Sequence, residues 1–151
     1  MTKSEKIEKA TEMLHRGFLT NFIGAQQRNA MLAVMRGDEA EFMADKTLEV
    51  AEQIKAAPTT YWNQDNGVED PVVHLHYFRG GIDAWITERD VGDDTQDGTG
   101  LDEQHQAFGK VCLTGDKADA EWGYISIPEL LGCRVELDLY WTPCPMSQVM
   151  A

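Results

Sequence analysis

The spacing of apolar residues changes at Pro58, and this change constrains the fold more than any other feature of the chain. Before Pro58, apolar residues recur every three or four positions, which is typical of helices that bury one face. After it, short segments rich in aromatic and β-branched residues are separated by links containing glycine and aspartate, which is typical of strands and turns. The sequence therefore predicts an α+β protein in which helices precede a sheet.

Three helices are expected within residues 1–57. Ser4 is the candidate N-cap of the first helix, and Gly37 is placed to end the second. The third is expected to start at Asp38, where D-E-A-E is similar to a capping box, and to end before Pro58. Their large apolar side chains predict a packed core or an interface with another chain. These side chains are Phe18, Phe22, Met31, Met35, Phe42 and Met43.

Strands are expected in five segments after Pro58. They are residues 72–78, 84–88, 107–113, 122–127 and 135–141. Gly80-Gly81 predicts a hairpin between the first two. The links are too short for repeated parallel crossovers, so we expect a mainly antiparallel, meander-like sheet with the helices packed on it. A short helix at residues 128–131, with proline in its first turn, is expected before the last strand.

Charge is divided at the same place as periodicity. Residues 1–57 carry 8 basic and 9 acidic side chains, whereas residues 58–151 carry 5 basic and 17 acidic ones, a net charge of −12. We expect a helical N-terminal region at 1–57 and an acidic β-rich domain at 58–151, together forming one compact unit. The net charge of −13 for the whole chain argues against direct binding of nucleic acid or of an anionic membrane.

The ends of the chain and its cysteines indicate a cytoplasmic protein. No apolar stretch has the form of a signal peptide or the length of a spanning helix. Cys112, Cys133 and Cys144 are odd in number, and no pair has C-x-x-C spacing. We therefore expect three reduced thiols and no zinc site made of cysteines alone.

Several ordered segments of the second region resemble one known family. They are W-I-T-E at 85–88 with Asp90, A-F-G at 107–109, E-W-G-Y-I-S at 121–126 with Glu129-Leu130, and E-L-D-L-Y-W at 136–141 with Pro143. In this order they resemble the domain-of-unknown-function family numbered 2958, which is found largely in bacteria, plasmids and phages. The resemblance covers about residues 70–148. It implies a fold and a mobile-element setting in the cytoplasm of a bacterial host, and it implies no mechanism.

Polar residues of the strands form the leading candidate site. They are Thr87, Glu88, Asp90, Glu121, Tyr124, Ser126, Glu136, Asp138 and Tyr140. Paired carboxylates can exchange protons when one is desolvated, but no spacing here shows which two are close, and a solvated acidic face is the alternative. We take seven of them as the predicted binding face for a basic protein partner. These seven are Glu88, Asp90, Glu121, Tyr124, Glu136, Asp138 and Tyr140.

Two patterns suggest metal binding. His74-x-His76 places two imidazoles on one face of a strand, which suits zinc or another divalent metal. A third ligand could come from any one of four residues, because no sequence spacing shows which of them lies near the two histidines. These four are Asp83, Asp90, His105 and Glu121. The alternative is that both histidines lie beside aromatic rings on a half-buried sheet face.

The acidic stretch 90–103 is expected to be a mobile, solvated loop. Within it, residues 93–98 resemble the start of a calcium-binding loop. Thr95 and Gln104 stand where an EF-hand needs an oxygen ligand at position three and a bidentate glutamate at position twelve, so we expect no calcium site.

Three functions remain open. The leading one is a non-enzymatic binding module whose acidic face engages a basic, nucleic-acid-binding protein, as a DNA mimic or an anti-defence protein of a mobile element. No cofactor is expected in that case, and no nucleophile motif or phosphate loop is present in the sequence. The second function is a metal-binding or metal-dependent enzyme domain that uses His74 and His76. The third is a structural domain that self-associates through residues 1–57.

Overall fold

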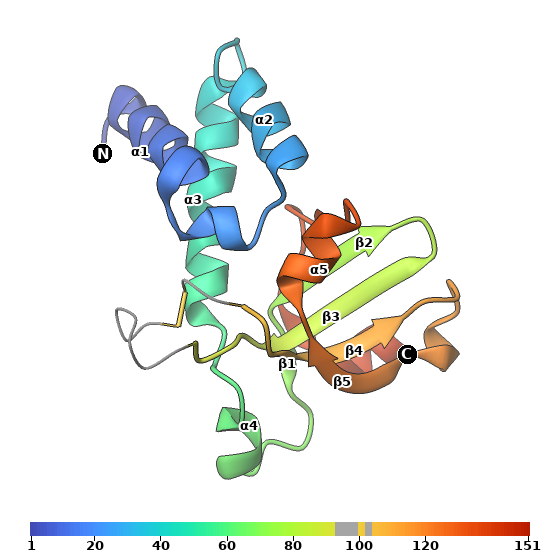
Figure 1. Cartoon of the computed structure of the whole chain (residues 1–151). Helices are drawn as coiled ribbons and strands as arrows, with labels where there is room; N and C mark the ends of the chain where they lie inside the picture. Colours follow the sequence, from blue (N-terminus) through green and yellow to red (C-terminus); the bar gives the residue numbers. More distant parts are fainter. Residues whose placement is uncertain (93–99, 102–103) are drawn as a thin grey trace.

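The computed structural model describes residues 1–92, 100–101 and 104–151, and it confirms an α+β protein with helices before the sheet. Figure 1 shows the first helices together on one side, with the sheet beside them. The helical elements of this part are α1 (Lys3–Arg16), the 3-10 turn η1 (Phe18–Asn21), α2 (Ala25–Val34) and α3 (Ala40–Ala56).

Two helix starts differ from those expected. Thr2, not Ser4, is the N-cap of α1, and its hydroxyl accepts the Glu5 N–H at 3.1 Å. Helix α3 begins at Ala40, not after a capping Asp38, and its N-cap makes no side-chain hydrogen bond. The reason is the turn before α3, in which the Ala40 N–H already bonds the Gly37 carbonyl at 3.2 Å.

The main sheet has five antiparallel strands in the order β5-β4-β3-β2-β6, as the meander prediction requires. The strands are β2 (Leu75–Arg79), β3 (Ile82–Glu88), β4 (Ala107–Cys112), β5 (Glu121–Ile125) and β6 (Glu136–Leu137). A second, two-stranded sheet pairs β1 (Val72–Val73) with β7 (Cys144–Pro145). The expected strand at 72–78 is therefore divided at His74 between two sheets.

The expected strand at 135–141 is wrong beyond Leu137. The Asp138 carboxylate accepts the Tyr140 N–H at 3.0 Å, and the Asp138 carbonyl accepts the Trp141 N–H at 3.3 Å. An aspartate that bonds the backbone two residues on forms a turn in place of a strand ladder.

Two local predictions are confirmed. Gly80, at a φ of +55°, and Gly81 turn the chain between β2 and β3. A short helix, α5 (Ile127–Gly132), precedes β6, and its N-cap Ser126 accepts the Glu129 N–H. Besides β7 and η1, further short elements were not expected. They are α4 (Trp62–Asp65), the 3-10 turn η2 (Lys117–Asp119) and α6 (Met146–Met150).

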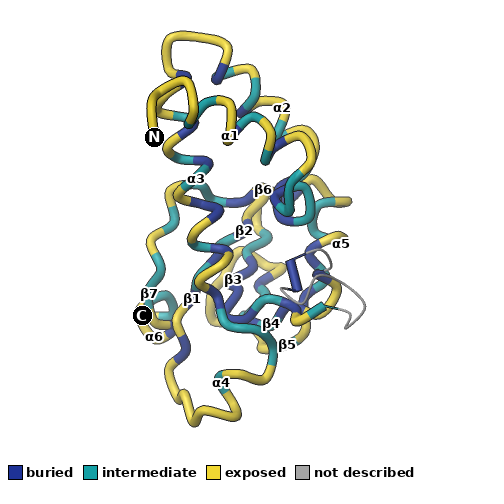
Figure 2. The backbone as a smooth tube through the Cα atoms, turned by 90° about the vertical axis from the view of Figure 1, so that its left-hand side faces the viewer, coloured by how far each residue is buried: buried dark blue, intermediate teal, exposed yellow. Residues whose placement is uncertain are grey.

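The two faces of the sheet are covered by different parts of the chain. Helices α1–α3 contribute to the larger hydrophobic core on one face, where Tyr77 of β2 donates a hydrogen bond to the Phe22 carbonyl. The C-terminal segment covers part of the other face in a smaller cluster around Trp85 and Met146. Figure 2 shows buried backbone between the helices and the strands, with β7 and α6 beside the sheet.

Only some of the apolar side chains predicted to form the helical core are buried. Phe22, Met31 and Met35 are buried, whereas Phe42 is 48 % exposed on α3. Self-association through residues 1–57 stays a prediction.

Candidate functional site

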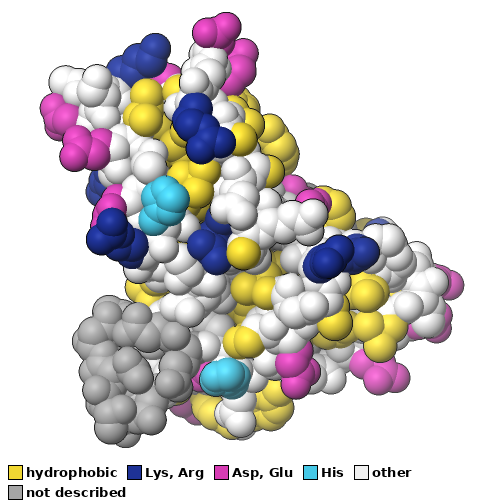
Figure 3. Space-filling model, turned by 45° about the horizontal axis from the view of Figure 1, so that its top comes forward, with side chains coloured by type: hydrophobic (Ala, Val, Ile, Leu, Met, Phe, Trp, Pro, Cys, Tyr) yellow, Lys and Arg dark blue, Asp and Glu magenta, His cyan; other side chains and the backbone are white. Residues whose placement is uncertain are grey.

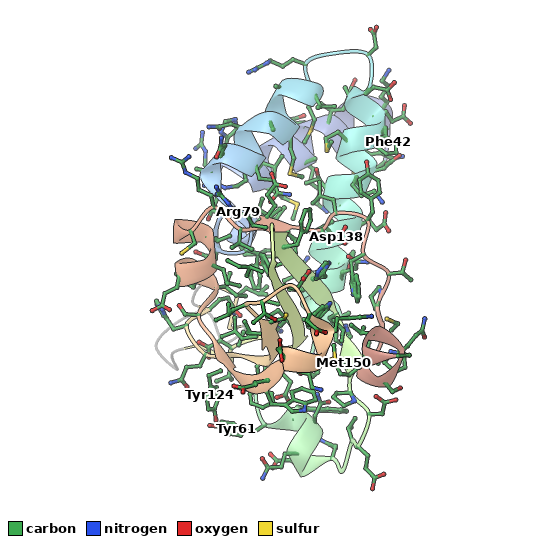
Figure 4. The ribbon with its side chains drawn as sticks, turned by 90° about the vertical axis from the view of Figure 1, so that its right-hand side faces the viewer. Phe42, Tyr61, Arg79, Tyr124, Asp138 and Met150 are labelled. Atoms are coloured by element: carbon green, nitrogen blue, oxygen red, sulfur yellow. The ribbon has the colours of Figure 1, made fainter. Side chains whose placement is uncertain are left out.

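The order of the strands separates the residues of the predicted binding face. Glu121 and Tyr124 lie on β5, at one edge of the sheet, whereas Glu136 lies on β6, at the other edge. Asp138 and the exposed Tyr140 follow β6 directly. Figure 4 shows Tyr124 beside Tyr61 and away from Asp138. On the side seen in Figure 3, Asp and Glu side chains lie in separate groups with Lys and Arg among them.

Asp90 is buried and braces the backbone around it. It is 9 % exposed, and its carboxylate accepts the N–H groups of Gly92, His105 and Gln106, each at 3.0 Å. Gln104 accepts the Asp90 N–H at 2.8 Å. Residues 93–99, on which the calcium-loop comparison depended, lie outside the described residues.

Glu88 lies at the end of β3, where a β-bulge changes the pairing with β4. Ile86 pairs with Gly109, but Glu88 pairs with Phe108, so Thr87 is an extra residue on β3. The Thr87 hydroxyl donates to the Phe108 carbonyl at 3.2 Å. The bulge thus ends the strand with the Glu88 side chain facing the segment that carries α4.

Aromatic rings surround Glu88 in a cleft of about 430 Å³. We call it the aromatic cleft and define it by Tyr61, Glu88, Phe108, Trp122 and Tyr124. Phe108 and Trp122 stack with ring centroids 5.6 Å apart, and Phe108 meets Tyr124 edge to face at 5.5 Å. The Tyr61 and Tyr124 hydroxyls share a hydrogen bond of 2.6 Å, which joins the α4 segment to β5.

Glu88 is the buried acidic residue of the aromatic cleft. The residue is 4 % exposed, and its Oε2 atom accepts the Asn63 N–H at 2.8 Å. None of the ion pairs formed within the described residues includes Glu88. The pKa of the Tyr124 phenol is raised, first by its hydrogen bond to Tyr61, then by partial desolvation and by the charges of Tyr61 and Glu88. The Lys110 ammonium of the same chain lies over the Trp122 ring, 5.2 Å from its centroid. The cleft therefore combines aromatic rings, one of them already facing a cation, with a carboxylate acceptor.

Tyr61 reaches the aromatic cleft through an uncommon backbone conformation. Its φ of +76° lies in the left-handed region, which a bulky residue rarely occupies. Such strain persists only where surrounding contacts hold it, and it is often found at functional sites.

The two histidines of the metal hypothesis have different surroundings. His76 has both ring nitrogens against carboxylates, Nε2 at 2.7 Å from Asp83 and Nδ1 at 3.1 Å from Asp138. These carboxylates lie on opposite sides of one ring, whereas metal ligands must converge on a point. His74 lines another depression, and burial lowers its pKa. The described part of the chain holds no group of three or more His, Cys, Asp or Glu side chains arranged for a metal ion.

The predicted binding face shares Glu88 and Tyr124 with this cleft, but it did not include Tyr61, Asn63, Phe108 or Trp122. The alternation of Trp122 and Tyr124 was a usable signal, since residues two apart in a strand share a face. No comparable pattern links residues 61–63 to β5, because that contact is made between segments far apart in the sequence.

No family model, curated protein or solved structure matches the chain. The resemblance to the family numbered 2958 therefore stays a prediction. Within the described ranges, no helix is both long and apolar enough to cross a membrane.

Proposed function

We propose that this chain is a binding protein whose aromatic cleft takes an arginine or lysine side chain of a basic partner protein. Cations bind favourably over the faces of tryptophan and tyrosine rings, and a carboxylate at the base of such a cleft adds a charge-assisted hydrogen bond. The proposal keeps the partner class that the acidic composition favours and assigns a specific site for contact.

The observation that carries this proposal is that Glu88 is buried and forms no ion pair among the described residues. The residue is 4 % exposed, and its carboxylate has one backbone N–H as its hydrogen-bond partner among the described residues. A buried charge without a countercharge is costly, and a bound guanidinium or ammonium group would offset that cost.

The net charge of the chain also favours a basic protein partner, because it acts over longer distances than the contacts in the cleft. A charge of −13 attracts basic surfaces and speeds encounter with them at low salt. Nucleic-acid-binding proteins carry such surfaces, so an acidic decoy for one of them is the form of this function that we favour. The mobile-element setting implied by the family resemblance is compatible with it.

The proposal is tested with Nα-acetyl-arginine methylamide, followed by ¹H–¹⁵N NMR. We expect shifts at Trp122 and Tyr124 with a Kd on the order of 1 mM, which is typical of one captured side chain. The matched probe is the citrulline derivative, which keeps the size of arginine but carries no charge, and it should bind at least tenfold more weakly.

Glu88→Gln is the decisive variant, because glutamine keeps the shape and can still accept the Asn63 N–H. It should lose most of the affinity for the arginine probe, whereas Glu121→Gln, on the exposed surface of β5, should not. Equal binding of arginine and citrulline, or full affinity in Glu88→Gln, would show that the cleft does not select a cation.

A further inference from the structure

The two edge strands of the main sheet, β6 and β5, differ in how far other segments of the described chain cover them. At the β6 edge the strand has two residues. The side-chain amide of Gln27 on α2 donates to the Leu137 carbonyl at 2.8 Å and accepts the Leu137 N–H at 3.0 Å. This side chain occupies the place of a further strand. Such covering is a common way to prevent a sheet edge from pairing with another chain.

The β5 edge has no comparable cover among the described residues. β5 has five residues and pairs with β4 alone. In an antiparallel strand, alternate residues direct their N–H and C=O groups away from the partner, so β5 has an unpaired outer edge. Among the described residues, no backbone hydrogen bond reaches that edge from another segment.

The composition of β5 favours pairing as well. The strand reads E-W-G-Y-I, without the lysine or proline that commonly blunt an edge. Trp122 and Tyr124 are 46 % and 55 % exposed.

We propose that an extended segment of a basic partner protein adds to β5 as a sixth strand of the sheet. Main-chain hydrogen bonds would supply the pairing, and the added strand would lie beside Trp122 and Tyr124 of the aromatic cleft. This inference rests on the proposed function for the identity of the partner, but it assigns a second contact with different chemistry.

The charge near β5 favours a basic segment over a second copy of this chain as the added strand. Glu121 is on β5, and Asp116 and Asp119 come just before it, so the start of the strand is acidic. A second copy of the chain would bring together two molecules of charge −13, whereas a basic segment meets opposite charge.

The probe is the peptide acetyl-Arg-Thr-Val-Thr-Val-Thr-Arg-amide, together with two forms that are N-methylated at alternate residues. In strand pairing only every second N–H of the peptide faces β5. We therefore expect one methylated form to bind at least tenfold more weakly and the other to bind as the parent does. Binding of the parent should also slow hydrogen exchange of β5 amides. No binding of the parent, or equal binding by both methylated forms, would overturn strand addition.

Two variants separate this inference from the proposed function. Glu88→Gln should lose the arginine derivative but keep the pattern of N-methylation effects, because the edge does not depend on that carboxylate. Glu121→Lys should weaken the basic peptide at least fivefold and strengthen the analogue with glutamate at both ends. A concentration-dependent dimer of the unliganded protein that protects β5 amides would instead make a second copy the occupant and would overturn the inference.

Discussion

His74 and His76 show how strongly the surroundings of single residues differ within one short segment. The His76 ring lies between two carboxylates, stacks on Trp85 at 5.8 Å, and meets Trp141 at 5.0 Å. It therefore joins β2 and β3 to the segment after β6. His74 lies among the residues of a different depression, with Trp62 and Arg89. The spacing of two residues predicted a shared role, but the chain passes from one sheet to the other at His74.

At the residue scale we predict that His74 makes stability depend on pH. Burial lowers its pKa below the ordinary 6.5, so near and below pH 6.5 the unfolded chain binds a proton that the folded chain does not. Stability is therefore lost as pH falls through this window and is retained above it. His74→Gln should remove this contribution, so the variant should gain stability relative to the wild type on going from about pH 7.5 to about pH 5.5.

Urea unfolding at the two pH values measures this difference. His15→Gln, at an exposed position of α1, is the matched control and should parallel the wild type. A constant difference between wild type and His74→Gln would exclude the effect.

At the scale of elements, the bulge between β3 and β4 decides how the aromatic cleft is built. Because Thr87 is extra, Glu88 comes opposite Phe108, and the two become neighbours in the cleft. Gly109 allows the close approach at this point, since an added Cβ would lie 1.9 Å from the Trp85 carbonyl oxygen. An alanine there would force the two strands apart.

Gly109→Ala should therefore lower the free energy of unfolding by about 3 kcal/mol or more. The matched control is Gly123→Ala, directly opposite Gly109 on β5 and facing open space. That change should be neutral or stabilise by up to about 1 kcal/mol, because alanine reduces the freedom of the unfolded chain. Chemical denaturation compares the two, and similar effects at both positions would contradict this account of the bulge.

At the scale of the whole molecule, the sheet lies between two unequal hydrophobic cores. The larger core includes residues of α1–α3, and the smaller one is completed by the C-terminal segment. Asp70 holds that segment by accepting hydrogen bonds from the Ser147 N–H at 3.0 Å and from its hydroxyl, and these bonds lower the pKa of Asp70. Met146 then lies against Trp85 and Cys112.

This arrangement predicts that α6 protects the thiol of Cys112. The residue is 1 % exposed, and its Sγ atom donates to the Asp116 carbonyl. In a Cys133→Ser/Cys144→Ser background, Cys112 should react slowly with a disulfide reagent. Deletion of residues 146–151 should raise the rate at least tenfold while the helical circular dichroism stays close to that of the parent.

The rate at which Cys112 reacts in the denatured chain is the upper limit of this assay. The rate in the double variant with residues 146–151 intact is the lower limit. If deletion leaves the rate unchanged, the smaller core does not depend on α6.

The sequence by itself determined the local structure of this protein. The change of period at Pro58, the Gly80-Gly81 turn and the proline-led helix before β6 are signals between near neighbours, and the α+β fold with its antiparallel sheet follows from them. Only the tertiary structure decided which predicted residues meet. It buried Asp90, placed Tyr124 and Glu136 at opposite edges of the sheet, and brought the α4 segment over β5. The physical reason is that a period of two shows which side chains share a face of a strand, but not which distant segment covers that face.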